Sequence, residues 1–268
     1  MKGIFKLAIV PLVAIMAFTP KTNIPDDNCT IPNISFKAGE KVSYVFYYAV
    51  AGVYVNAGTA SFTNTLETFN GKPVFHIVGE GSTNSSYDWV YKVKDKYETF
   101  IDTTTMQPLK FIRNVHEGDF KLYHNVTFNK TANTAITNEG VFKVPECVQD
   151  VVSAVYYVRN VDFSKLRKND KVAFSMFLDN QVYNMYMRYV GKETIKTKYG
   201  KFRTIKIMPL TIEGSIFEGG EKMSVWVTDD PNHVPVRIES PLLVGKIKVD
   251  MMGFQNLRHP LTSLLRQN

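Results

Sequence analysis

From Phe36 onward the chain alternates between apolar and polar residues with a period of two. The clearest example is the segment 41–50, KVSYVFYYAV, which is rich in β-branched and aromatic residues. Side chains of a strand point alternately to opposite faces, so this pattern predicts a β-strand. One of its faces is wholly apolar and consists of Val42, Tyr44, Phe46, Tyr48 and Val50. The opposite face is half apolar, which indicates that the strand is covered on both sides.

A hairpin is predicted at Asn70-Gly71, because this dipeptide readily supplies the two positive φ angles of a type I′ turn. It should pair Gly58–Phe69 with Lys72–Glu80. His76 lies on the polar face of that hairpin, and we interpret it as a partly exposed cross-strand histidine rather than a base or a metal ligand. The register of a two-residue loop predicts a buried face made of Phe62, Asn64, Leu66, Phe75, Ile77 and Gly79.

Another turn, at Asp179-Asn180, joins Lys171–Leu178 to Gln181–Val190. Pairing across it brings methionine and aromatic residues to one face. Such side chains adapt to irregular shapes and can line a cavity for an acyl chain or a sterol-like ligand, although plain core packing uses the same residues. The candidate ligand-binding residues on this face are Phe174, Met176, Tyr183, Met185 and Met187.

Further alternating segments, separated by turn signals, predict the rest of the sheet. They are Tyr97–Ile101, Lys110–Val115, Lys121–Phe128, Gly191–Ile195, Lys201–Ile212, Lys222–Thr228, Val234–Glu239 and Lys246–Met252. Only Val148–Val158 departs from the period of two. Its valines recur at helical spacing and Asp150 lies in the first turn, so this segment is predicted to be a helix. The predicted fold is therefore all-β and mainly antiparallel: a strongly curved sheet, open barrel or sandwich, with one short helix.

No long low-complexity linker divides the chain, so we expect one β-rich domain over residues 36–255, as a single body or as two β lobes around the helix. Residues 256–268 contain four leucines and could form a short amphipathic helix. A frayed tail is the prediction for this segment.

The N-terminus has the layout of a secretory signal, with Lys2 and Lys6 followed by the apolar run Leu7–Phe18. The run is shorter than the roughly 20 residues that span a bilayer, and no later segment is long enough to do so. We therefore expect a signal peptide over 1–17, a linker over 18–35 and a periplasmic or secreted mature protein. Because no cysteine follows the apolar run directly, a lipid anchor is not expected.

Composition and charge limit the classes of partner and cofactor that the protein could bind. Removing Lys2 and Lys6 lowers the formal net charge from +7 to +5, and the basic residues are scattered, which argues against nucleic acid as a partner. An oxidising compartment favours a disulfide between Cys29 and Cys147, the two cysteines of the chain. Neither cysteine has a second cysteine or a histidine at metal-ligand spacing, so no metal site is predicted, and no cofactor motif is present.

Candidate catalytic chemistry is sparse. Asp229-Asp230 after Trp226 could be read as paired carboxylates beside a sugar-stacking ring, and Asp102 is a further carboxylate. The run Asp-Asp-Pro-Asn is also strong turn chemistry, and adjacent strand residues point to opposite faces. We therefore assign no catalytic residue, while a glycan-acting enzyme stays open as an alternative.

Six motifs in order then suggest a family. They are FKAGEKVSYVFYY, DKYETFIDTTTMQPLKF, HEGDF, CVQDVVSAVYYVRN, GKETIKTKYGKFRTIKIMP and VWVTDDPNHVPVRI, spread over most of Phe36 to Phe254. Because it contains these motifs in this order, the chain resembles the exported bacterial family catalogued as domain of unknown function 3108. The resemblance implies a β-rich protein of the periplasm or envelope and assigns no residue a role. A looser similarity is to the open β-barrels of periplasmic lipoprotein carriers, which hold acyl chains against a curved sheet.

Three functions follow from these observations. The prediction is a non-catalytic envelope protein that binds an apolar or amphipathic, lipid-like ligand in a concave β surface. One alternative is a structural or assembly factor that acts through contacts with an envelope protein partner. The other is the glycan-acting enzyme, using carboxylates such as Asp102, Asp229 or Asp230.

Overall fold

The computed structural model describes residues 22–23, 29–50, 53–87, 92–212, 219–242 and 245–267. The predicted signal peptide, residues 1–17, lies outside the described residues. Among the helices that are described, none is both long and apolar enough to cross a membrane.

All the strands of the described residues belong to one sheet, which is not closed into a ring. It runs in the order β1-β10-β11-β12-β13-β14-β15-β2-β3-β4-β5-β6-β7-β8-β9, and β16 pairs with β12. Only the short β1 pairs in parallel. In chain order the strands are β1 Thr22–Asn23, β2 Lys41–Val50, β3 Val53–Phe69, β4 Lys72–Thr83, β5 Lys94–Asp102, β6 Pro108–Glu117, β7 Phe120–Asn129, β8 Thr134–Thr137, β9 Gly140–Lys143, β10 Lys171–Leu178, β11 Gln181–Lys196, β12 Gly200–Pro209, β13 Ser224–Thr228, β14 Pro235–Pro241, β15 Lys246–Gln255 and β16 Leu264–Gln267.

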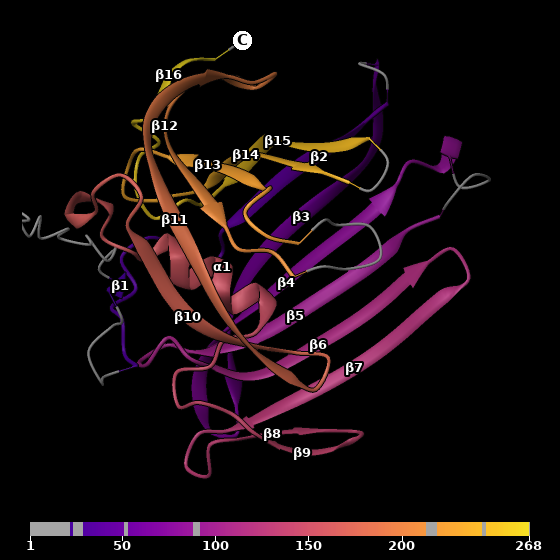
Figure 1. Cartoon of the computed structure of the whole chain (residues 1–268), viewed down its shortest axis with the longest axis vertical. Helices are drawn as coiled ribbons and strands as arrows, with labels where there is room; N and C mark the ends of the chain where they lie inside the picture. The colour runs from indigo at the N-terminus through magenta and orange to yellow at the C-terminus, as the bar shows by residue number, and fades with distance from the viewer. Residues whose placement is uncertain are drawn as a thin grey trace, which may run out of the picture.

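The sheet curves around α1 (Val151–Arg159), the one α-helix of the described residues, which lies between β5 and β10 (Figure 1). Two 3-10 turns, Ser85–Tyr87 and Phe163–Lys165, complete the helical structure described. On one side of α1, Tyr156 packs edge-on against Phe36, and on the other Tyr157 packs near Phe174. The predicted all-β, mainly antiparallel fold with a strongly curved sheet and one helix is confirmed.

The two predicted hairpin turns form as expected. Asn70 and Gly71 have φ angles of 50° and 78°, and Asp179 and Asn180 have 48° and 60°. These angles suit two-residue turns, and both predicted registers are observed. His76 is half-buried. Its ring nitrogens hydrogen-bond to Glu67 and Glu98 and its ring stacks on Phe100, in agreement with its predicted cross-strand role.

One part of the predicted buried face is wrong. Asn64 and Ile77 are fully buried, but Leu66 is 60% exposed. Leu66 lies close to the turn, at the end of the hairpin, where other residues do not cover its side chain. The buried part of β3 on this side therefore ends at Asn64.

The segments 181–190 and 191–195 were expected as two strands and form one, β11. The pairing with β12 shifts by one residue between Tyr189 and Gly191, which is a β-bulge. Gly191 accepts a φ of 145° there. The bulge bends the strand without ending it, so the pattern of side chains changes while the ladder continues.

Four strands were not expected, namely β1 within the predicted linker, β8, β9 and β16. β8 and β9 are only four residues each, too short for a clear alternation. The C-terminal segment is neither a frayed tail nor a helix. Leu264–Gln267 forms β16, which pairs with the first residues of β12, and β13 does not pair with those residues. Gly200 allows this approach, since a Cβ there would lie 2.5 Å from the Arg266 carbonyl oxygen.

The helix starts three residues later than the predicted Val148–Val158. Gln149 instead pairs as a parallel bridge with Met176 of β10. Asp150 then caps the helix: its Oδ1 accepts from the Val152 and Ser153 backbone N–H groups, and its backbone N–H donates to Ser153 Oγ. The capping carboxylate therefore ends the extended segment and begins the helix.

A buried ion pair fixes the other end of α1. Arg159 donates through Nη1 and Nη2 to the two carboxylate oxygens of Glu40, at 2.6 and 2.9 Å, and both side chains are almost fully buried. Its Nε also donates to the Asn232 carbonyl. The guanidinium lies 5.5 Å from the Phe36 ring centroid and 5.0 Å from that of Tyr156. The C-terminus of the helix is thereby joined to the residues just before β2.

The hairpin β10–β11 is held across the interior by contacts at its turn. Asp179 forms an ion pair with Arg113 of β6, and Asn180 bonds to His124 of β7 at 3.2 Å. The predicted disulfide, Cys29–Cys147, is present and joins the N-terminal segment to the turn that precedes α1. These links bring the two ends of the sheet toward each other without a strand ladder between them.

Replacing Glu40 with alanine leaves the Arg159 guanidinium buried without its partner. We expect Glu40→Ala to lower the free energy of unfolding by about 3–5 kcal/mol, as is usual when a buried ion pair is broken. The double variant Glu40→Leu/Arg159→Met removes both charges and should lie closer to the wild type. Urea unfolding measures both. A loss in Glu40→Ala no larger than the ~1 kcal/mol of an exposed pair would contradict the anchoring role.

Candidate functional site

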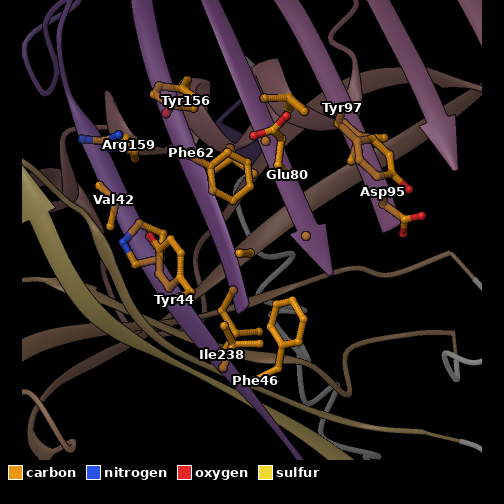
Figure 2. A pocket seen from close by; sticks show the side chains of 18 residues that line it. Val42, Tyr44, Phe46, Phe62, Glu80, Asp95, Tyr97, Tyr156, Arg159 and Ile238 are labelled. Carbon is orange, nitrogen blue, oxygen red and sulfur yellow. The ribbon is translucent and has the colours of Figure 1, made fainter. Parts of the chain in front are cut away.

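The interior of the curved sheet contains a cavity of about 370 Å³ on one side of α1, which we call chamber A. β2 contributes Val42, Tyr44 and Phe46, β3 contributes Phe62, and α1 contributes Val152 and Tyr156. Figure 2 shows the strand residues around the opening, with Tyr97 and Asp95 of β5 on the side opposite Val42 and Tyr44. Most of this lining is aliphatic or aromatic.

A second cavity of about 360 Å³, chamber B, lies against β10–β13. Four of the five predicted ligand-binding residues line it, namely Phe174, Met176, Met185 and Met187. The fifth, Tyr183, pairs with Met176 across the hairpin and is half-buried, but it is not part of the lining. The methionine-rich face predicted from the Asp179-Asn180 turn therefore forms one wall of a cavity.

The two chambers meet along one face of α1. Val151, Val155 and Arg159 line both chambers, and their spacing of four residues places them on one side of the helix. Pro235 and Ile238 of β14 also line both. Val155 is 40% exposed although the helix is enclosed by the sheet. We call the helix face formed by Val151 and Val155 the ridge.

Small residues make room for chamber A. Gly79 lies under the Phe62 ring, and a Cβ at this position would be 2.7 Å from Phe62 Cε1. Gly81, two residues further along β4, lines the chamber and has more space, since its Cβ would lie 3.5 Å from Phe46 Cζ. Gly81 therefore leaves volume that a larger residue would fill, whereas Gly79 has no space for a side chain beneath Phe62.

Several polar groups that border chamber A are buried or paired. Burial raises the pKa of the Tyr44 and Tyr156 hydroxyls far above the usual range, although Arg159 opposes the shift. Burial also raises the pKa of Tyr97 to about 12 and that of Asp95 above its usual value. Since the charge of Arg159 is matched by Glu40, the inner part of the chamber offers no free charge to a ligand.

The carboxylates considered for glycan chemistry bind backbone groups or form ion pairs. Asp102 accepts from the backbone N–H groups of its own turn, and Asp229 pairs with Lys192 at 2.8 Å. Asp230 accepts from the backbone N–H groups of Asn232 and Ser263. These contacts agree with the turn interpretation, and none of the three residues lines chamber A or chamber B.

Chamber A and the ridge were not identified from the sequence. The signals were present: Val42, Tyr44 and Phe46 form an apolar stripe, and two glycines alternate on one face of β4. These features read equally well as ordinary core. Only the placement of α1 inside the sheet shows that the stripe is incompletely covered.

The fold and the cavity together define a class of protein: an open, barrel-like β-sheet that encloses one helix and apolar chambers. The chain belongs to the family described as "Protein of unknown function (DUF3108)", whose model matches residues 43–252. The resemblance carried by the ordered sequence motifs is thereby confirmed. No curated protein matches the chain.

Solved structures of other proteins share this architecture. The beta-barrel-like protein of domain of unknown function DUF1849 from Brucella abortus matches with a TM-score of 0.55 at 6% identity, over 83% of this chain and 99% of that chain. At this identity the likeness shows the fold alone. A candidate lipoprotein from Parabacteroides distasonis (TM-score 0.34, 12% identity) and a candidate exported protein with a YmcC-like fold from Bacteroides fragilis (0.33, 11%) each cover 84% of this chain and 99% of their own. These two scores are too low to support a structural argument.

The glycines of β4 allow a matched test of the packing in chamber A. We expect Gly79→Ala to lower the free energy of unfolding by about 1–3 kcal/mol, because its new methyl group overlaps the Phe62 ring. Gly81→Ala adds the same group to the same strand face where there is space, so its effect should stay within about 0.5 kcal/mol. Chemical denaturation compares the two variants. Equal losses would show that the Phe62 contact does not limit this position.

Protonation of Asp150 should make the stability of the protein depend on pH. Burial raises the Asp150 pKa to about 6, even though hydrogen bonds from Thr99 and the helix N-terminus favour the carboxylate. The folded chain therefore holds a proton that the unfolded chain releases near pH 3.8, and this contribution to stability is lost as the pH rises through about 6. Lys130, whose pKa burial lowers to about 8, stays charged below that pH in both states.

We expect the wild type to lose on the order of 3 kcal/mol of unfolding free energy relative to Asp150→Asn between pH 4 and pH 7. The measurement is urea unfolding of both proteins at intervals across this range. If the difference between them does not change with pH, Asp150 titrates normally in the folded protein.

Proposed function

We propose that this protein is exported and binds a lipid-like ligand in the apolar interior of its sheet. The observation that carries the proposal is the exposed ridge. A valine that is 40% accessible on a helix enclosed by a sheet is an apolar surface that packing has not covered. Apolar side chains gain about 25 cal/mol for each Å² removed from water, so a ligand that covers the ridge would bind favourably.

The size and chemistry of the chambers support an apolar ligand. Each chamber has a volume within the ~300–1,000 Å³ range of small-molecule sites, and together they are large enough for an amphiphile. Phenols that stay neutral and an ion pair that is already satisfied would not attract a charged group into the interior. Methionines in chamber B adapt to flexible chains.

Export is supported by the disulfide. Cys29 and Cys147 are bonded, and structural disulfides persist in oxidising compartments such as the bacterial periplasm. The N-terminal signal layout points to the same compartment. A periplasmic or secreted location would give the protein access to envelope lipids.

The test is lipid capture by the protein purified from its own envelope. Native mass spectrometry should detect a co-purifying lipid on the wild type. Val155→Asn places a polar amide on the ridge and should weaken binding of a fluorescent fatty acid by about tenfold, which corresponds to about 1.4 kcal/mol. Val182→Asn is the matched control, because Val182 of β11 is 38% exposed and lies in neither chamber.

Two results would count against lipid binding. One is a wild type that carries no lipid and binds no fatty acid while remaining folded. The other is an equal loss of binding in Val155→Asn and Val182→Asn, since only Val155 belongs to the cavity.

A further inference from the structure

The two chambers have nearly the same volume and different walls. Chamber A lies against β2–β5 and chamber B against β10–β13, with about 370 and 360 Å³ respectively. Both have an almost entirely apolar lining, and they share the ridge of α1 and two residues of β14, Pro235 and Ile238. The two chambers therefore adjoin each other along α1 and are similar in volume and in apolar character.

We propose that the ligand is an amphiphile with two apolar chains, such as a diacyl lipid, with one chain in each chamber and the junction of the chains at the ridge. This inference rests on the proposed lipid-binding function and specifies its ligand. A ligand with one chain would occupy one chamber and leave the other uncovered. A rigid fused-ring ligand could not bend over the helix to reach both.

The ridge suits the junction of two chains for two reasons. Val151 and Val155 line both chambers, so chains that part at this point can enter each chamber directly. Val155 is also 40% exposed, so solvent reaches the point where the chains would meet. The polar head group can then stay in water while the chains lie in the apolar interior, as burying it unpaired would be costly.

The interior does not compete for the head group. The nearest strong charge, Arg159, lines both chambers but is bonded to Glu40 and to the carbonyls of Ser35 and Asn232. Its remaining capacity to bind an anion is small. We therefore expect the number of chains, rather than the charge of the head group, to govern selection.

The number of bound lipids tests this directly. After removal of co-purified lipid, the wild type is mixed separately with dipalmitoyl phosphatidylcholine and with palmitoyl lysophosphatidylcholine, and native mass spectrometry counts the bound molecules. We expect one diacyl molecule, or two single-chain molecules, per protein. Binding of only one single-chain molecule, or of two diacyl molecules, would overturn the two-chamber assignment.

Variants that fill one chamber make the test sharper. Gly81→Leu fills part of chamber A, and Val225→Phe fills part of chamber B. Each should weaken diacyl binding at least about tenfold and lower the single-chain count from two to one. Val182→Phe, which enlarges a side chain of β11 that lines neither chamber, is the control and should bind as the wild type does.

The outcomes separate the two proposals. If the folded wild type binds neither lipid, the proposed function itself is wrong. If both lipids bind but Val225→Phe leaves diacyl binding unchanged, the protein is a lipid binder that uses one chamber, and only the two-chain inference fails. Should a filled variant not fold, as judged by its thermal midpoint, the wild-type count still decides the question.

Discussion

The buried ion pair between Arg159 and Glu40 determines where the helix lies, and the helix determines the cavity. A helix of nine residues is too short to be stable by itself, so α1 depends on what holds its ends. Its first turn is capped by Asp150, directly after Gln149 pairs with β10, and its last residue reaches Glu40 just before β2. The helix is therefore attached to both walls of the curved sheet. If either attachment were lost, the ridge would no longer divide the interior.

The interior combines dense packing with space left open. Around Phe36 and Tyr156 the aromatic rings interlock at 4.7 Å between centroids, as in an ordinary core. A few residues away, Val155 remains 40% exposed and Gly81 leaves volume that a side chain could fill. Larger side chains at these positions would cover part of this apolar surface. Their absence supports the proposal that the surface binds a ligand.

Charged groups support the fold, including Arg159, which lines both chambers. Arg159 is saturated by Glu40, and Arg113 binds Asp179 at the turn that crosses the interior. The carboxylates Asp102 and Asp230 fasten loops through backbone hydrogen bonds. An interior whose lining is mostly apolar is suited to apolar ligands, because a buried charge without a partner would be unfavourable.

The sequence by itself predicted the disulfide, because the chain has two cysteines and a signal for export, and it determined most of the strands and both hairpin registers. Asn70-Gly71 and Asp179-Asn180 accept positive φ angles, and a period of two decides which residues share a face, so these features depend on neighbours in the chain. It also selected Phe174, Met176, Met185 and Met187, because their face follows from one turn. Chamber A, the ridge and β16 could not be predicted in this way. They depend on α1 lying inside the sheet and on the end of the chain reaching β12, and such contacts between distant segments leave no periodic signal in the sequence. The pairing of Arg159 with Glu40, 119 residues away, is of this kind, and only the tertiary structure brings the two together.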